Sequence, residues 1–122
     1  MKTKQNTEIG AQGEKIAQQY LKGVGFCILQ TNWRFRHKEI DIIAKKDNVI
    51  HIVEVKTRTS HIAGNPQDAV TKQKQKFLIY AANAYVETID FEGGIQFDII
   101  SVIIQNNTSK LQYIPDAFYP QL

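Results

Sequence analysis

The sequence is poor in the residues that cross-link small proteins or bind soft metals. Its 122 residues include one cysteine, Cys27, which excludes an internal disulfide and a cysteine-rich zinc site. The three histidines, at positions 37, 51 and 61, have no close metal-ligand spacing. The fold must therefore be held by a packed core, and the cysteine usage favours a reducing compartment.

Long apolar runs are also missing. The longest apolar stretches, such as Ile99–Ile104, are far too short to span a bilayer. The opening residues, MKTKQNTEIGAQGEK, contain no apolar segment of the kind that a secretory signal needs. We therefore expect no membrane partner, and together with the single cysteine these features predict a cytoplasmic protein.

A strong charge of one sign is absent as well. Fifteen Lys and Arg stand against twelve Asp and Glu, which gives a formal charge of +3. This mild excess permits a nucleic-acid partner without requiring one. The length and the 43% hydrophobic content predict a single domain over residues 1–122 and exclude an economical two-domain enzyme.

Periodicity and turn residues predict two helices and five strands in an α/β (α+β) domain built on a mixed sheet. Asn65 and Pro66 are typical of a helix N-cap and first helical position. The expected order is helix 8–24, strands 26–33, 39–45 and 49–58, helix 65–87, and strands 95–105 and 110–114. In the second strand, alternation places Ile40, Ile42 and Ala44 on one face.

The hairpin between residues 39 and 58 carries the main candidate for chemistry. A short loop at Asp47 and Asn48 pairs residues whose numbers sum to 95, which sets Asp41 opposite Glu54. Two facing carboxylates repel unless a cation lies between them. Hard oxygen ligands favour Mg²⁺ or Mn²⁺, and Lys56 would lie one step further along the same face.

A plainer interpretation of the same residues stays open. The register also pairs Glu39 with Lys56, so these two could form an ordinary cross-strand ion pair while Asp41 and Glu54 face solvent. Glu14, at the edge of the apolar stripe of the first helix, either points toward the sheet as a third acid or favours the helix dipole.

Several cations are candidates for binding a phosphate backbone. Arg34, Arg36 and Lys38 alternate with aromatic residues and would share one side if the segment were extended. Arg58 follows Lys56 on one face, and its planar fork suits phosphate. Lys74 lies within the apolar stripe of the second helix, where it either snorkels to solvent or reaches the acidic pair.

Ordered motifs cover nearly the whole chain. They are Gly10-Ala-Gln-Gly13-Glu14, Asn32-Trp33-Arg34, Glu39-Ile-Asp41-Ile-Ile-Ala44, Val53-Glu54-Val55-Lys56-Thr-Arg58, Lys74 with Ala81-Ala82 and Tyr85, Phe97-Asp98, and Ala117-Phe118. Through them the chain resembles the YraN-like family of predicted bacterial endonucleases. That family is similar to archaeal Holliday-junction resolvases and belongs with the restriction-endonuclease-like nucleases.

The resemblance implies an αβββαβ core around a mixed sheet, which agrees with the element order above. It implies that Asp41 and Glu54 are metal ligands, that Lys56 is the catalytic lysine, and that Glu14 completes the metal site. The backbone carbonyl of Val55 is a further candidate ligand. The leading hypothesis is a Mg²⁺- or Mn²⁺-dependent nuclease acting on DNA, including branched DNA.

Two other classes of function remain open. One is a nucleic-acid-binding module of the same fold without turnover, and the other is an adaptor in which the acids and lysines only stabilise the sheet. Resolvase-like nucleases often pair two sites, so a homodimer through the apolar tail Ala117-Phe118-Tyr119 is a further expectation by analogy.

Overall fold

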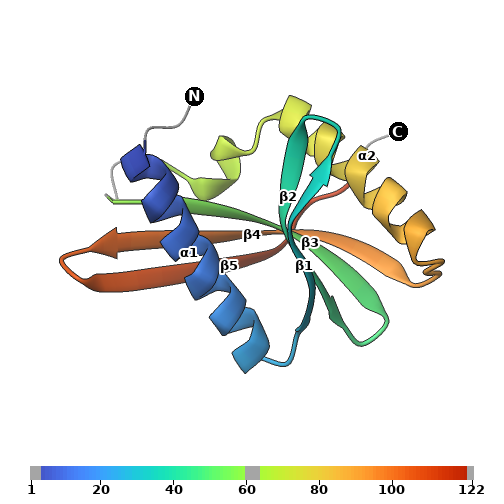
Figure 1. Ribbon diagram of the computed structural model, residues 1–122, viewed down its shortest axis with the longest axis horizontal. Coiled ribbons are helices and arrows are strands. Elements are labelled where there is room, and N and C mark those ends of the chain that lie inside the picture. Colours follow the sequence, from blue (N-terminus) through green and yellow to red (C-terminus); the bar gives the residue numbers. More distant parts are fainter. Residues whose placement is uncertain (1–3, 60–63, 121–122) are drawn as a thin grey trace.

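The computed structural model describes residues 4–59 and 64–120, and side chains from residue 8 onward. The elements are α1 (Lys4–Gly23), β1 (Cys27–Phe35), β2 (Lys38–Lys46), β3 (Val49–Arg58), the 3-10 turn η2 (Pro66–Ala69), α2 (Lys72–Thr88), β4 (Gly94–Gln105) and β5 (Thr108–Phe118). The predicted α+β order, one helix, three strands, a second helix and two strands, is confirmed (Figure 1).

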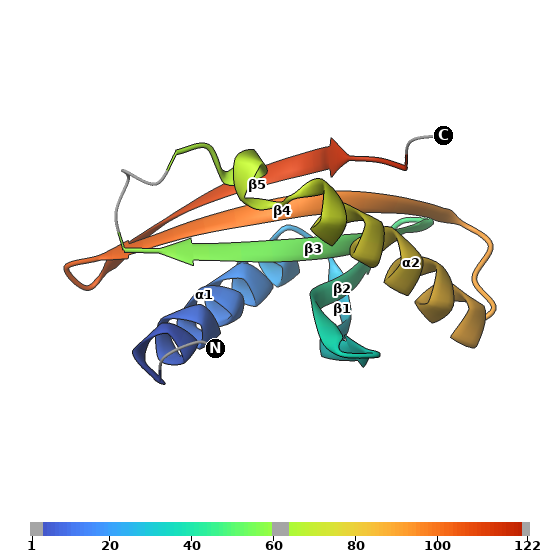
Figure 2. The ribbon, with the colours of Figure 1, turned by 90° about the horizontal axis from the view of Figure 1, so that it is seen from above.

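The five strands form one mixed sheet in the order β1-β2-β3-β4-β5. Only β3 and β4 are parallel, and a parallel pair needs a long crossover, which η2 and α2 provide. The other neighbours are antiparallel hairpins. In both views the far end of the β1–β2 hairpin lies between α1 and α2 (Figures 1 and 2).

The sheet separates two apolar cores. Ala17 and Leu21 of α1, four residues apart and fully buried, pack with Val53 and other residues on one face. On the other face α2 buries Leu78, Ala81, Ala82 and Tyr85 against the sheet. Because β3 is covered on both sides, residues 49–53 are apolar except for His51, and this makes the buried acid that follows them, Glu54, conspicuous.

Two details of the predicted elements are wrong. The second helix does not begin at Asn65, because Pro66–Ala69 forms a separate 3-10 turn and α2 starts at Lys72, where the Thr71 hydroxyl accepts from the Lys74 amide at 3.1 Å. Ile40 does not share a core with Ile42 and Ala44. It packs on the α2 side, since β2 turns away from β3 beyond Ile42.

The basic-aromatic segment is not one extended strip. Arg36 and His37 form a two-residue turn between β1 and β2, and Arg36 has a positive φ of 59°. The turn folds the segment back, so that Phe35 pairs with Lys38 and Arg34 pairs with Glu39. Trp33 and Phe35 face the α2 core, which leaves Arg34, their neighbour in the alternation, on the opposite face.

A buried carboxylate ties the central strands to β5. Asp98 is fully buried and accepts four hydrogen bonds, from His51 Nδ1 (2.7 Å), Tyr113 Oη (2.6 Å), Gln96 Nε2 (2.9 Å) and the Asp116 amide (2.9 Å). Burial alone would raise the pKa of Asp98, but these hydrogen bonds hold it below its ordinary value. The network therefore fixes β3, β4 and β5 to one another at the end of β3 remote from Lys56.

Helix α1 approaches the sheet closely at one residue. A Cβ atom at Gly13 would lie 1.8 Å from the Thr57 Oγ1 atom, so no larger residue fits there without movement. This contact holds the middle of α1, which carries Glu14, against the end of β3. Within the described residues, no helix combines the length and apolar content that a bilayer crossing needs.

Replacing Gly13 by alanine tests this seat. The added methyl group collides with Thr57, so we expect Gly13→Ala to lower the free energy of unfolding by about 1–3 kcal/mol. Gly10→Ala in the same helix is the matched control, because nothing lies within 4 Å of its added Cβ and alanine favours helix. Urea denaturation measures the free energy of unfolding of both variants. Equal changes in Gly13→Ala and Gly10→Ala would contradict the close approach of α1 to Thr57.

Candidate metal centre

The site begins where β2 separates from β3. Their pairs run from Lys46–Val49 to Ile42–Val53, which confirms the predicted register over this part of the hairpin. One residue further, a side chain takes the place of the next backbone hydrogen bond between β2 and β3. Asp41 Oδ2 accepts a hydrogen bond from the Val55 amide at 2.8 Å. The strand end thus directs the Asp41 carboxyl group to the Glu54 carboxyl group, with which it shares a hydrogen bond.

Glu54 is only 3% exposed and shares one oxygen between two lysines. Its Oε2 atom lies 3.8 Å from Lys56 Nζ and 3.5 Å from Lys74 Nζ. Its Oε1 atom is buried, and when both acids are ionised no group in the described part of the chain donates a hydrogen bond to it. A buried carboxylate oxygen without a donor is costly, so this atom is the clearest opening for a cation.

The ionisation of Asp41 reflects the same crowding of negative charge. Burial, repulsion by Glu54 and the hydrogen bond with Glu54 together raise the pKa of Asp41 to about 7. The Val55 amide and the ammonium of Lys74 act in the opposite direction and do not outweigh them. The pair therefore holds a proton up to neutral pH unless another positive charge replaces it.

The pair opens into a cavity of about 530 Å³ that α1, β2, β3 and α2 enclose. Its lining consists of Ile9, Gly10, Glu14, Asp41, Glu54, Val55, Lys56, Thr57, Thr59 and Lys74. Glu14 lies on this wall, where its Oε1 atom accepts from Asn32 Nδ2 of β1 at 2.8 Å. Among the described residues, no three side chains of His, Cys, Asp or Glu gather closely enough to hold a metal ion.

This donor set fits a hard divalent cation with open coordination positions. Asp41 and Glu54 supply carboxylate oxygens, and Val55, which directly follows Glu54, also lines the cavity and offers its backbone carbonyl as a further candidate ligand. Mg²⁺ commonly uses one or two carboxylates and takes its other ligands from water and phosphate. Glu14 is placed to contact such ligands from the wall rather than to join the carboxylate pair.

The plainer interpretation of the hairpin is wrong for Glu54. The β2–β3 pairs end at Ile42–Val53, before Glu39 and Lys56 could face each other, and Glu54 is buried instead of facing solvent. The ammonium of Lys56 approaches the carboxylate two residues before it. Lys74, for which two positions were open, reaches the acidic pair from α2.

The other predicted phosphate-binding cations fall into three places. Arg36 and Lys38 lie beside α2, where Arg36 stacks on Phe35 and Tyr80 at 5.2 and 5.9 Å and Lys38 on Phe77 at 5.6 Å. Arg34 is on the other face of the hairpin, so the three do not form one strip. Arg58 donates from Nη1 to the Gly64 carbonyl at 2.7 Å at the end of β3.

Phe77 and Tyr80 are the residues that the sequence analysis missed. With Lys74 they recur every three residues on one face of α2, and Lys74 Nζ lies 5.5 Å from the Phe77 ring. That spacing is visible in the sequence. It indicates a shared surface only once the structure shows that the β1–β2 hairpin packs beside this face of α2.

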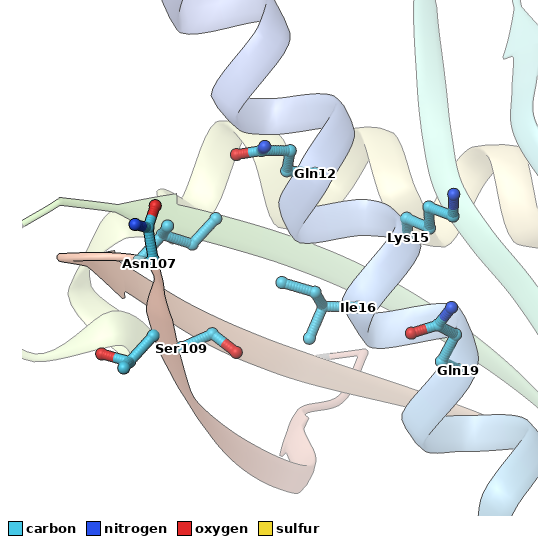
Figure 3. A pocket seen from close by; sticks show the side chains of 8 residues that line it. Gln12, Lys15, Ile16, Gln19, Asn107 and Ser109 are labelled. Atoms are coloured by element: carbon cyan, nitrogen blue, oxygen red, sulfur yellow. The ribbon is translucent and has the colours of Figure 1, made fainter.

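A second cavity, of about 520 Å³, lies between α1 and the turn joining β4 and β5. Figure 3 shows Gln12 and Ile16 of α1 on the side of Asn107 and Ser109, while Lys15 and Gln19 lie on the helix farther from them. Its polar groups are amides, hydroxyls and one ammonium, without a carboxylate. It therefore lacks the charged oxygen ligands that the Asp41–Glu54 cavity provides.

Comparison with known proteins agrees with the motifs. Residues 13–102 match the family described as Uncharacterised protein family UPF0102. The chain belongs to this family. It is 44% identical over 115 residues to the UPF0102 protein of Flavobacterium psychrophilum, covering 94% of this chain and 97% of that protein. It is 41% identical over 118 residues to the UPF0102 protein of Bacteroides thetaiotaomicron, covering 97% and 98%.

The family-level part of the resemblance is thereby confirmed, because UPF0102 is the YraN-like family. The matched residues include Glu14, Asp41, Glu54, Lys56 and Lys74, so the whole cavity except its α1 edge at Ile9 and Gly10 lies inside the UPF0102 match. The names of these two UPF0102 proteins state no activity.

Replacing Asp41 by asparagine tests the electrostatic account without metal. A carboxyl group whose pKa is raised by folding stabilises the protein below its unfolded value of 3.8, and this stabilisation is lost as the pH rises to about 7. Asparagine keeps an oxygen for the Val55 amide and removes the charge. Relative to the parent, Asp41→Asn should gain roughly 2 kcal/mol of stability between pH 4 and pH 8, an estimate reduced for the open cavity.

The measurement is urea unfolding of both proteins in a chelator across this pH range. Comparing the two proteins cancels the contributions of titrating groups that do not interact with Asp41, such as Asp98. A difference that stays constant with pH would contradict the crowding of charge at Asp41.

Proposed function

We propose that this protein is a Mg²⁺- or Mn²⁺-dependent nuclease of the restriction-endonuclease-like type. It hydrolyses phosphodiester bonds in DNA, including branched intermediates of recombination and repair. The observation that carries the proposal is the buried Glu54 carboxylate with one oxygen lacking a donor, facing Asp41 and flanked by Lys56 and Lys74. Carboxylates beside ammonium groups in an open cavity suit phosphate bound together with a cation.

Asp41, Glu54 and the Val55 carbonyl would hold the cation, with Glu14 beside them. When bound, such a cation lowers the pKa of water and neutralises charge on the phosphate. Val55 orients the Asp41 carboxyl through its amide, which fixes one ligand on a rigid strand. Lys74 and the α2 helix close the opposite wall of the cavity.

Lys56 is the residue that we assign to the reacting phosphate. Its side chain is one-third exposed and lines the cavity, so its ammonium can leave Glu54 Oε2 for a phosphate oxygen. There it would stabilise the negative charge that builds up during attack and position the attacking water by hydrogen bonding. Lys74, similarly placed, would hold a neighbouring phosphate oxygen.

Cleavage assays on labelled linear, nicked, flapped and branched DNA with each metal test the proposal. We expect Lys56→Ala to lower the cleavage rate roughly a hundredfold or more, as the loss of one charge-stabilising group does in other enzymes. Lys110→Ala, an exposed lysine of β5, is the matched control and should leave the rate unchanged. If the parent protein cuts no DNA with either metal, the proposal is wrong.

Metal binding can be tested separately by thermal unfolding. Mn²⁺ at about a hundred times its dissociation constant should stabilise the parent by about 2.7 kcal/mol through mass action. Asp41→Asn and Glu54→Gln each remove one anionic ligand and should lose most of this shift. Equal shifts in parent and variants would place the cation elsewhere.

The second candidate is a nucleic-acid-binding module without turnover. The cations and exposed aromatics beside α2 favour it, because they could bind DNA whether or not the acidic pair acts. It predicts salt-dependent DNA binding that survives Lys56→Ala in a protein that never cleaves. The homodimer stays a prediction, which light scattering with and without DNA would test.

A further inference from the structure

A continuous series of side chains connects the acidic pair with the tip of the β1–β2 hairpin. From Glu54 it passes to Lys74 Nζ at 3.5 Å and then to the Phe77 ring at 5.5 Å. Lys38 Nζ also lies 5.6 Å from the centre of the Phe77 ring, and the Phe35 and Phe77 ring centres are 6.2 Å apart. We call Arg36, Lys38, Phe77 and Tyr80 the hairpin–helix surface, which continues from the cavity to exposed residues.

The hairpin–helix surface adjoins the positively charged N-terminal turns of α2. The first two turns of α2 carry Lys72, Lys74 and Lys76, with no acidic residue in the first turn. Lysines at a helix N-terminus oppose the helix dipole, which favours anions there. These lysines weaken the free helix, and a bound chain of phosphates would relieve the repulsion.

Tyr80 is the exposed aromatic residue of the hairpin–helix surface. It is 68% exposed and holds the Arg36 guanidinium 5.9 Å from the centre of its ring. Arg36 itself occupies the left-handed region at φ 59°, a conformation that glycine or asparagine adopts at lower cost. An exposed ring beside a planar cation is a stacking platform for a nucleobase.

Stacking of this kind selects unpaired bases. Inside a duplex both faces of each base are covered by its neighbours, so a flat protein surface reaches base faces only at an end, a flap or a single-stranded segment. The phosphates of the same strand could then follow Lys38 and Lys74 toward Glu54. From the exposed Tyr80 inward, the strand would meet Lys38, then Lys74 and then Glu54, which is the order of the side-chain contacts described above.

We infer that the hairpin–helix surface binds unpaired nucleotides next to the phosphodiester that the acidic pair acts on. The substrate class is therefore DNA in which a single-stranded segment adjoins a duplex. This inference rests on the proposed function for the position of the cut, while the stacking site itself rests on Arg36, Phe77 and Tyr80.

The test is fluorescence anisotropy with a blunt duplex and the same duplex carrying an unpaired oligothymidine tail. All proteins carry Asp41→Asn so that no DNA is cut. We expect tighter binding of the tailed duplex and roughly a tenfold loss of that affinity in Tyr80→Ala, in keeping with the loss of one stacked base, with the blunt duplex unaffected. Tyr80→Phe keeps the ring and should retain the preference.

Lys38→Gln should weaken binding of the tailed duplex and reduce the salt dependence of binding by about one phosphate contact. Lys45→Gln is its control, because Lys45 also stacks on an aromatic ring, that of Phe91 at 5.7 Å, but sits at the other end of β2. Thermal unfolding of each variant verifies that it is folded.

The inference is overturned if the parent shows no preference for the tail, or if Tyr80→Ala weakens both duplexes equally or neither. These failures differ from failure of the proposed function. A protein that cleaves DNA independently of Tyr80 refutes the stacking site alone. A protein that prefers the tail through Tyr80 but never cleaves with either metal refutes the nuclease and leaves the stacking site intact.

Discussion

The hydrogen bond from the Val55 amide to the Asp41 carboxylate is the interaction on which the candidate site depends. It forms where β2 leaves β3, and it replaces the next rung of the backbone ladder with a side chain. Departure of β2 opens the sheet into a cavity, while this bond keeps Asp41 beside Glu54. Beyond this point the β1–β2 hairpin packs against α2, and its aromatic residues Trp33 and Phe35 complete the apolar core on the α2 side of the sheet.

The acidic pair could be predicted because its causes are local. A short hairpin loop fixes the register, and the period of two in strands puts Asp41 and Glu54 on one face. The end of the ladder could not be predicted, since it depends on the curvature of β2 around α2. The same curvature separates Ile40 from Ile42, against the simple alternation.

The second helix shows in another way what could not be predicted from the sequence. Asn65 and Pro66 carry a genuine start signal, but the turn that they begin stops at Ala69, and Thr71 caps the real helix. Sequence left the position of Lys74 open because helical spacing gives only a direction around the axis. Its partner Glu54 lies twenty residues away, on a strand that the crossover brings beneath α2. Phe77 and Tyr80 acquire meaning only through that same non-local contact.

The two lysines on one glutamate oxygen have a thermodynamic consequence. With its carboxylates ionised, the cavity lining sets the three acids Glu14, Asp41 and Glu54 against Lys56 and Lys74, and its net charge is −1. A divalent cation alone would leave it positive, and a phosphate alone would make it more negative. Each ion therefore favours the other, so cation and nucleic acid would bind as linked ligands, and the affinity for either would depend on the concentration of its companion.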